Sequence, residues 1–152
     1  MAKKTISFRV PGAAQPRGSK RGFAFKRASG AVGVAMVDSC KKSGAWMDRV
    51  STFALEAYSG EPLDGPVVLA VACYFARPRS HYGSGKNAGT VKASAPKFKT
   101  TTPDCSKLLR GIEDALTGII YKDDRQIIWT TCTKFWGDSD FVQIEIEEAT
   151  DG

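Results

Sequence analysis

The feature that most constrains the fold is an uncharged run at 66–76, PVVLAVACYFA. Its β-branched and aromatic residues are typical of a strand in the centre of a sheet. No apolar run in the 152-residue chain approaches the roughly 20 residues that a membrane span needs. The run therefore predicts a central strand inside a globular protein, with no membrane as a partner.

Around this strand the sequence predicts both helices and further strands. Apolar residues recur at three- and four-residue steps in 43–59 and in 105–117, which favours two amphipathic helices. The remaining strands are expected at 5–11, at 23–26 and 32–37 as a hairpin, and at 127–135 and 141–146 as a closing antiparallel pair. The pattern predicts a single α+β domain over 1–152, with two main helices packed on a mixed β-sheet.

Charge is distributed unevenly along the chain, which has a net charge of +6. No acidic residue occurs before Asp38 or between Asp64 and Asp104, and acid is concentrated from Asp104 onward. A basic surface around an acidic centre suits a protein that holds a polyanion and performs metal chemistry on it. The alternative is that these are ordinary surface lysines and arginines that serve solubility.

Two basic segments are candidates for contacting such a polyanion. A Gly- and Pro-rich loop spans 12–22, and 77–103 is expected to be a basic, mobile loop without regular structure. The second segment holds the only histidine, His81, for which a surface role without chemistry outweighs one as a general base. The candidate residues for contacting the phosphates of a polyanion are Arg17, Lys20, Arg21, Arg77, Arg79, Lys86, Lys97, Lys99 and Lys107.

The cysteines argue against a zinc site. Cys40, Cys73, Cys105 and Cys132 are scattered and form no C-x-x-C pair. The N-terminus has a basic start but no apolar segment typical of a secretory signal. The sequence therefore predicts free thiols in a reducing cytoplasm.

Acidic residues near the second predicted helix are the candidates for chemistry. Asp104 precedes this helix, Glu113 and Asp114 lie within it, and Asp123 and Asp124 follow it. Asp104 can simply cap the helix, and the adjacent pair can form an ordinary polar turn. Alternatively a cation offsets the repulsion of the pair, since Mg²⁺ takes oxygen ligands and needs few carboxylates. The two acidic sites would then have to meet through tertiary folding.

The run at 102–127, TPDCSKLLRGIEDALTGIIYKDDRQI, resembles the signature of the RusA family of Holliday-junction resolvases. That signature reads approximately P-D-x-D-N-L-x-K-x-x-x-D-A-L-x-G, a short apolar stretch and D-D-x-Q-[IV]. Weaker similarity extends to the opening FRVPG at 8–12 and to the strand that leads into ARPRSHY at 76–82.

The resemblance implies a homodimeric, Mg²⁺-dependent endonuclease, with Mn²⁺ as a substitute metal. It would bind four-way DNA junctions by shape and cut two strands symmetrically. By position, Asp104 matches the first metal-binding Asp, and Asp124 matches the essential later Asp with Asp123 beside it. Asp114 matches the acid of D-A-L, in a supporting role. Members are common in phages, so the resemblance implies a role in recombination or repair in the cytoplasm of a bacterial or phage-infected cell.

The motif departs from the family at three positions. Ser106 replaces the second Asp, Lys107 replaces the Asn, and Arg110 replaces the Lys. A hydroxyl is a poor Mg²⁺ ligand, so Ser106 is at most a weak one, whereas Arg110 keeps the charge that can hold a phosphate.

Several explanations for Ser106 remain open: a divergent but active branch, a nuclease that only binds junction DNA, or an engineered change. A third class of function is a basic structural protein whose acids serve only as caps and turns.

Overall fold

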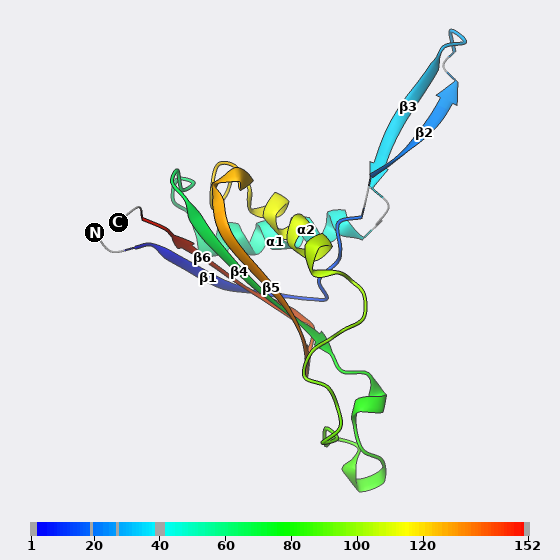
Figure 1. The fold of residues 1–152 in the computed structure, drawn as a ribbon, viewed down its shortest axis with the longest axis vertical. Helices are drawn as coiled ribbons and strands as arrows, with labels where there is room; N and C mark the ends of the chain where they lie inside the picture. Colours follow the sequence, from blue (N-terminus) through cyan, green and yellow to red (C-terminus); the bar gives the residue numbers. More distant parts are fainter. Residues whose placement is uncertain (1–2, 19, 27, 39–41, 151–152) are drawn as a thin grey trace.

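The structure is a computed structural model that describes residues 3–18, 20–26, 28–38 and 42–150 (Figure 1). For 20–26 and 33–38 it describes the backbone alone. None of the described helices is long and apolar enough to cross a membrane.

The main sheet is built around the uncharged run. Its four strands, in spatial order, are β1 (Thr5–Pro11), β6 (Phe141–Glu148), β4 (Val67–Ala76) and β5 (Ile127–Gly137). β4 pairs antiparallel with β6 and parallel with β5. Alternate residues of β4 from Val67 to Phe75 are buried, as expected for a strand whose one face forms the core. The predicted central strand and mixed sheet are thus confirmed.

Two helices cover one face of this sheet, and Figure 1 shows them side by side. They are α1 (Ser43–Ala57) and α2 (Cys105–Leu116). Their buried residues, such as Val50 on α1 and Ile112 on α2, join the alternate residues of β4 and β6 in one core. The periodicity that predicted both helices therefore arises from their buried faces. The α+β prediction is confirmed.

The predicted closing pair of strands is wrong. β5 and β6 run in opposite directions, but β4 lies between them and pairs with both. The connection 138–140 passes over the end of β4, where Asp140 Oδ1 accepts the backbone N–H of Ala76 at 2.8 Å. A three-residue connection is typical of a hairpin, and nothing in the alternation of side chains reveals an intervening strand.

Two segments project from the body of the molecule in Figure 1. One is the hairpin of β2 (Lys20–Lys26) and β3 (Val32–Asp38), close to the predicted ranges. The other is 77–103, which contains the 3₁₀ turns η1 (Arg79–His81) and η2 (Gly85–Asn87). Its end returns to the sheet, where Phe98 forms a bridge with Phe135 of β5. The mobility expected for this segment stays a prediction.

Candidate metal and nucleic-acid site

Asp104 begins α2 without serving as its hydrogen-bonding cap. It occupies the N-cap position, yet its side chain accepts no capping hydrogen bond. The side chain is 58% exposed, and its Oδ2 lies 3.9 Å from Lys107 Nζ. An N-cap aspartate ordinarily accepts an N–H from the first turn. The carboxylate of Asp104 is instead presented to solvent at the positive end of the helix dipole.

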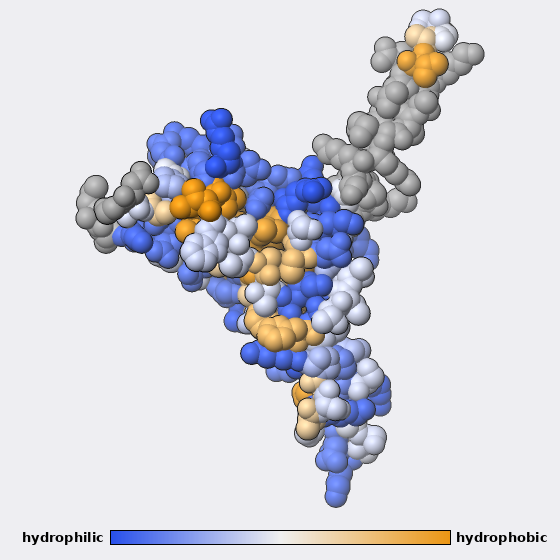
Figure 2. All heavy atoms as spheres, viewed as in Figure 1, coloured by the Kyte–Doolittle hydropathy of each residue, from blue (hydrophilic) through white to orange (hydrophobic). Residues whose placement is uncertain are grey.

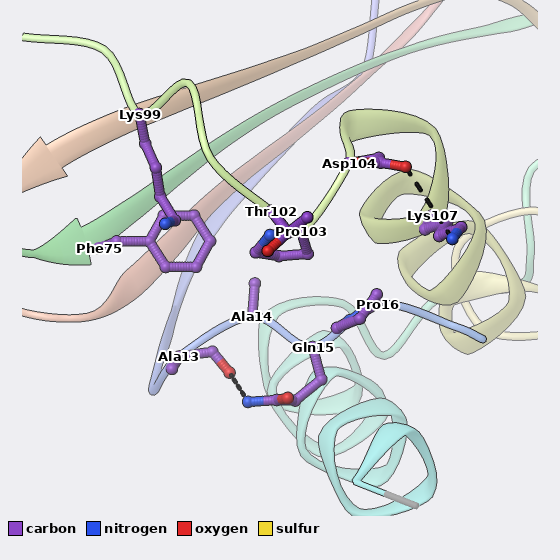
Figure 3. Close-up of a pocket in the computed structure, with 10 residues that line it drawn as sticks. All are labelled: Ala13, Ala14, Gln15, Pro16, Phe75, Lys99, Thr102, Pro103, Asp104 and Lys107. Atoms are coloured by element: carbon purple, nitrogen blue, oxygen red, sulfur yellow. Dashed lines mark hydrogen bonds and ion pairs between the residues drawn. The ribbon is translucent and has the colours of Figure 1, made fainter. Parts of the chain in front are cut away.

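A surface hollow of about 450 Å³ lies beside Asp104. Figure 3 shows Asp104 and Lys107 on one side of it and Lys99 beside the ring of Phe75 on the other. The ammonium of Lys99 lies 5.4 Å from the ring centroid of Phe75 and 4.6 Å from that of Trp136. Burial and the positive charge of Lys134 lower the pKa of Lys99. The hollow therefore combines one carboxylate with two lysines, which is a suitable surface for a phosphate.

The start of α2 is held against β5. The thiol of Cys105 donates to the carbonyl oxygen of Cys132 at 3.4 Å. Lys134 Nζ donates to the carbonyl oxygens of Thr101 at 2.7 Å and Pro103 at 2.8 Å. Lys134 was not among the predicted site residues. The signal was available, because it is the only charged residue in the stretch of β5.

The cysteines of the site region carry free thiols. Cys73, Cys105 and Cys132 are unpaired, while Cys40 lies outside the described residues. Burial is the main cause that raises the pKa of Cys105, and contact with Cys73 together with burial raises the pKa of Cys132. Both therefore behave as neutral thiols rather than as thiolate ligands.

Asp123 forms hydrogen bonds within its own turn. Its Oδ1 accepts the backbone N–H of Arg125 at 3.0 Å, and its own N–H donates to Gln126 Oε1 at 2.8 Å. This is a capping box for the 3₁₀ turn η3 (Asp124–Gln126). The hydrogen bond from the Arg125 backbone is the main cause that lowers the pKa of Asp123. Gln126 Nε2 extends the network to the carbonyl oxygens of Leu63 and Gly65.

The charge of Asp124 acts on Glu113 in the last turn of α2, together with that of Asp114. Burial, then the negative charges of Asp124 and Asp114, raise the pKa of Glu113, against the opposing charge of Arg110. Tyr121 is buried and donates its hydroxyl to the carbonyl oxygen of Glu113 at 2.8 Å. Asp114 is partly neutralised, because its Oδ2 lies 3.1 Å from Arg17 Nη1.

The structure does not bring the two predicted acidic sites together within one chain. Asp104 precedes the first residue of α2, while Asp123 and Asp124 follow its end. A 12-residue helix is about 18 Å long. In the part of the chain that the structure describes, no three His, Cys, Asp or Glu side chains form a group that could hold a metal. Ser106 and Arg110 lie on α2 between the two ends, and both are exposed.

Five of the predicted DNA-binding residues fall into two groups. Arg17 and Arg77 are tied to the protein: Arg17 pairs with Asp114, and Arg77 Nη1 donates to the Pro96 carbonyl oxygen at 2.8 Å. Arg79, Lys86 and Lys97 are exposed on the 77–103 segment. The side chains of Lys20 and Arg21 lie outside the described part of the structure. His81 packs edge-on against Trp136, with ring centroids 5.0 Å apart.

Comparison with known proteins shows the family of this chain. Residues 13–147 match the family model of the endodeoxyribonuclease RusA. The chain belongs to the RusA endodeoxyribonuclease family. It is also 32% identical over 88 residues to the uncharacterized protein YqaN of Bacillus subtilis (strain 168). That similarity covers 58% of this chain and 61% of the relative.

The match to the RusA family model includes both acidic sites and most of the fold. Nucleases of this family use Mg²⁺. The donor chemistry here fits such an ion, because Asp104 and Asp124 offer exposed carboxylate oxygens. A single chain nevertheless keeps these two carboxylates at opposite ends of α2.

Proposed function

We propose that this protein is a Mg²⁺-dependent endodeoxyribonuclease that resolves four-way DNA junctions by paired, symmetric nicks. The observation that carries the proposal is the RusA match, which spans both Asp104 and Asp123-Asp124. The exposed, uncapped carboxylate of Asp104 supports it, because a side chain kept only for helix capping would accept a hydrogen bond there. Mn²⁺ is the expected substitute for Mg²⁺.

We further propose that the metal site is completed by a second copy of the chain. Asp104 and Asp124 lie at opposite ends of α2, so they cannot share an ion within one copy. In a two-fold dimer the same surface meets itself with its two ends exchanged. Asp104 of one copy can then approach Asp124 of the other. A four-way junction has approximate two-fold symmetry, so such a dimer would address two strands in the same way.

We propose the following roles for the site residues. Asp104 and Asp124 would hold the metal, and Ser106 is at most a weak additional ligand, since it carries only a hydroxyl. A divalent metal held there supplies a Lewis acid and an activated water for phosphodiester hydrolysis. Arg110 is exposed on α2 between them and would stabilise negative charge on the phosphate. Asp123 shapes the turn that carries Asp124, and Asp114 would play a supporting role by holding Arg17 against α2.

DNA binding would rest on cations at the surface of the protein. Lys99 and Lys107 border the hollow beside Asp104, and Arg79, Lys86 and Lys97 extend along the 77–103 segment. The hairpin of β2 and β3 carries Lys20 and Arg21 on the second projecting segment. Contacts of this kind to backbone phosphates position a duplex without reading its sequence. They suit recognition of a junction by its shape.

A second candidate function is junction binding without cleavage. The observation in its favour is Ser106, which removes a carboxylate from the start of α2, where the family signature has Asp. This candidate predicts tight junction binding with no Mg²⁺-dependent nicks. It also predicts that Ser106→Asp restores cutting.

The test incubates the purified protein with a labelled four-way junction and with a linear duplex of matched sequence, in Mg²⁺ and in EDTA. The proposal predicts paired nicks in the junction alone, abolished by EDTA and by Asp124→Asn. Leu55→Lys, on the exposed surface of α1, serves as a matched control and should cut normally. Binding without nicks in the wild type, with cutting gained in Ser106→Asp, would instead support the second candidate.

A further inference from the structure

Four aromatic rings and one guanidinium group form a continuous stack across the main sheet. Tyr74 of β4 lies between Phe135 of β5 and Phe141 of β6, with ring centroids 5.0 Å and 4.4 Å away and interplanar angles of 22° and 13°. The guanidinium of Arg9 on β1 lies 4.0 Å from the ring centroid of Phe141. At the other end, the ring of Phe98 lies 5.4 Å from that of Phe135. The stack therefore crosses all four strands and continues beyond the outer edge of β5.

The stack is open at Phe98. β4 lies between β5 and β6, so both faces of the Tyr74 ring are covered by other rings. Phe135 lies between Tyr74 and Phe98, and Arg9 covers the end of the stack at β1. Among the described residues, Phe98 contacts one ring only, and it is 49% exposed. Figure 2 shows hydrophobic colouring where the 77–103 segment leaves the body of the molecule.

A lysine lies beside this open ring without covering its outer face. The ammonium of Lys97 is 5.4 Å from the ring centroid of Phe98 and 5.8 Å from that of Phe135. The two centroids are themselves 5.4 Å apart, so a cation on the outer face of Phe98 would lie much further from Phe135. The ammonium is therefore beside both rings. Lys97 is exposed, and the segment 77–103 contains no acidic residue, so this charge is available to a phosphate.

The open ring is fixed next to the hollow that Asp104 borders. Backbone hydrogen bonds to β5 hold the residues on both sides of Phe98. Phe98 packs against Phe135 and Lys99 against Trp136, and these two residues of β5 point to opposite faces of the sheet. Lys99 lines the hollow (Figure 3). A ring and a cation thus lie on the two sides of one strand edge, a single residue apart.

We propose that the outer face of Phe98 is the stacking site for an unpaired base of a bound DNA strand. Every base has a π-face, so a ring with one free face accepts any of the four. The rings behind Phe98 hold it in place, so little side-chain freedom is lost on binding. Lys97 and Lys99 would contact phosphates of the same strand.

The placement of this site bears on the proposed function. At the branch point of a junction, a base has lost a stacked neighbour and costs least to unpair. A base held on Phe98 would keep its strand at the outer edge of β5, with a phosphate beside Lys99 and Asp104. This link to cleavage rests on the proposed function, whereas the open ring and its lysines do not depend on it.

The alternative is that the stack only stabilises the sheet. Cross-strand aromatic pairs do so, and this accounts for Tyr74 and its two neighbours, whose faces cover one another. It does not account for the exposure of Phe98, because a ring that served only packing would gain more by being covered. The two explanations differ in what they predict for the binding of bases.

Binding is measured in EDTA, where no metal-dependent cutting occurs, by fluorescence anisotropy of two labelled single strands of equal length. One is a run of thymidines, and the other is the same sugar–phosphate chain without bases. The wild type should bind the thymidine strand about 5- to 150-fold more tightly, which is the effect of stacking one base. Phe98→Ala and Phe98→Leu should bring the ratio of the two dissociation constants close to one. Phe98→Tyr should keep the wild-type ratio.

Two further variants separate the ring from the charge. Lys97→Ala should weaken the binding of both strands equally and make binding less dependent on salt, because it removes a phosphate contact and no ring. Leu55→Ala is the matched control, since Leu55 is 59% exposed on α1, and it should change neither strand's binding. Circular dichroism confirms that every variant is folded.

A wild type that does not prefer the thymidine strand would overturn the proposal. So would a folded Phe98→Ala or Phe98→Leu protein that keeps the wild-type ratio. Junction cleavage in Mg²⁺ is measured separately on the wild type. A base preference that depends on Phe98, in a protein that cuts no junction, would overturn the proposed function alone. Junction cutting by a protein without this base preference would overturn the stacking site alone.

Discussion

The two ends of α2 carry acids of the same family motif, but the protein uses them differently. At the start, Asp104 accepts no capping hydrogen bond, and its Oδ2 lies 3.9 Å from Lys107 Nζ. Beyond the other end, Asp123 is part of a capping box, and Gln126 ties that turn to the chain at Leu63 and Gly65. The carboxylate at the first end is therefore exposed and uncapped, while hydrogen bonds hold the turn that carries Asp124 beyond the second end.

This difference predicts that the two ends respond to mutation in different ways. Substitutions at Asp104 should change activity and leave stability nearly unchanged. Substitutions at Asp123 should change stability first. The following predictions test that division, beginning with the largest effect.

Asp104→Asn should lower the rate of junction cleavage in Mg²⁺ by at least about 100-fold, since a metal-bound carboxylate is worth several kcal/mol in the transition state. Its melting temperature without metal should stay within about 2 °C of the wild type, because no capping hydrogen bond is lost. Gel assays and thermal melts measure the two effects. A large fall in melting temperature with unchanged cleavage would assign Asp104 a structural role and contradict the division.

Asp123→Ala should lower the melting temperature by roughly 2–4 °C, because the capping hydrogen bond to the Arg125 backbone is lost. Asp123→Asn keeps an oxygen that can accept this hydrogen bond and should lie between Asp123→Ala and the wild type. The folded state holds the pKa of Asp123 below its ordinary value. The stability that the Asp123 carboxylate contributes is therefore complete above its ordinary pKa. This stability is lost as the pH falls through the lowered pKa of the folded state. An Asp123→Ala protein that is as stable as the wild type at pH 7 would show that the capping box does not stabilise the fold.

Glu113→Gln should raise the melting temperature at pH 7 by about 1–2 °C, the smallest of the effects. The pKa of Glu113 is raised by burial and by the charges of Asp124 and Asp114, so the folded state binds its proton more tightly than the unfolded state does. Stability from this group is thus present at low pH and is lost as pH rises through the ordinary and then the raised pKa. The gain in melting temperature from Glu113→Gln should therefore become smaller at a pH below the ordinary pKa of Glu113. A destabilised variant at pH 7 would show that the Glu113 charge is compensated.

Much of the local structure could be predicted from the sequence. The period of apolar residues predicted α1 and α2 because each helix has one buried face, and the uncharged run predicted β4 because it lies between two strands. The family motif gave the candidate acids without any structure.

Relations between distant segments could not be predicted in the same way. The pairing of β5 with β6 was wrong because side-chain alternation reports which face is buried and not which strand lies alongside. The separation of Asp104 from Asp124 depends on the direction of α2 relative to β5. The engagement of Arg17 with Asp114 likewise depends on the loop meeting α2 in space, so a basic loop in the sequence did not distinguish Arg17 from the exposed Lys97.

The central claim is that an active site combines Asp104 of one copy with Asp124 of another, and mixing two inactive variants tests it most directly. Asp104→Asn and Asp124→Asn should each be inactive alone. After their copies are exchanged, half of the dimers contain one of each, and every such dimer has one site with both acids intact. The account predicts single nicks in junctions at about a quarter of the wild-type rate in Mg²⁺. A mixture as inactive as either variant alone, with exchange verified by mass, would mean that each site belongs to one chain and would contradict the account.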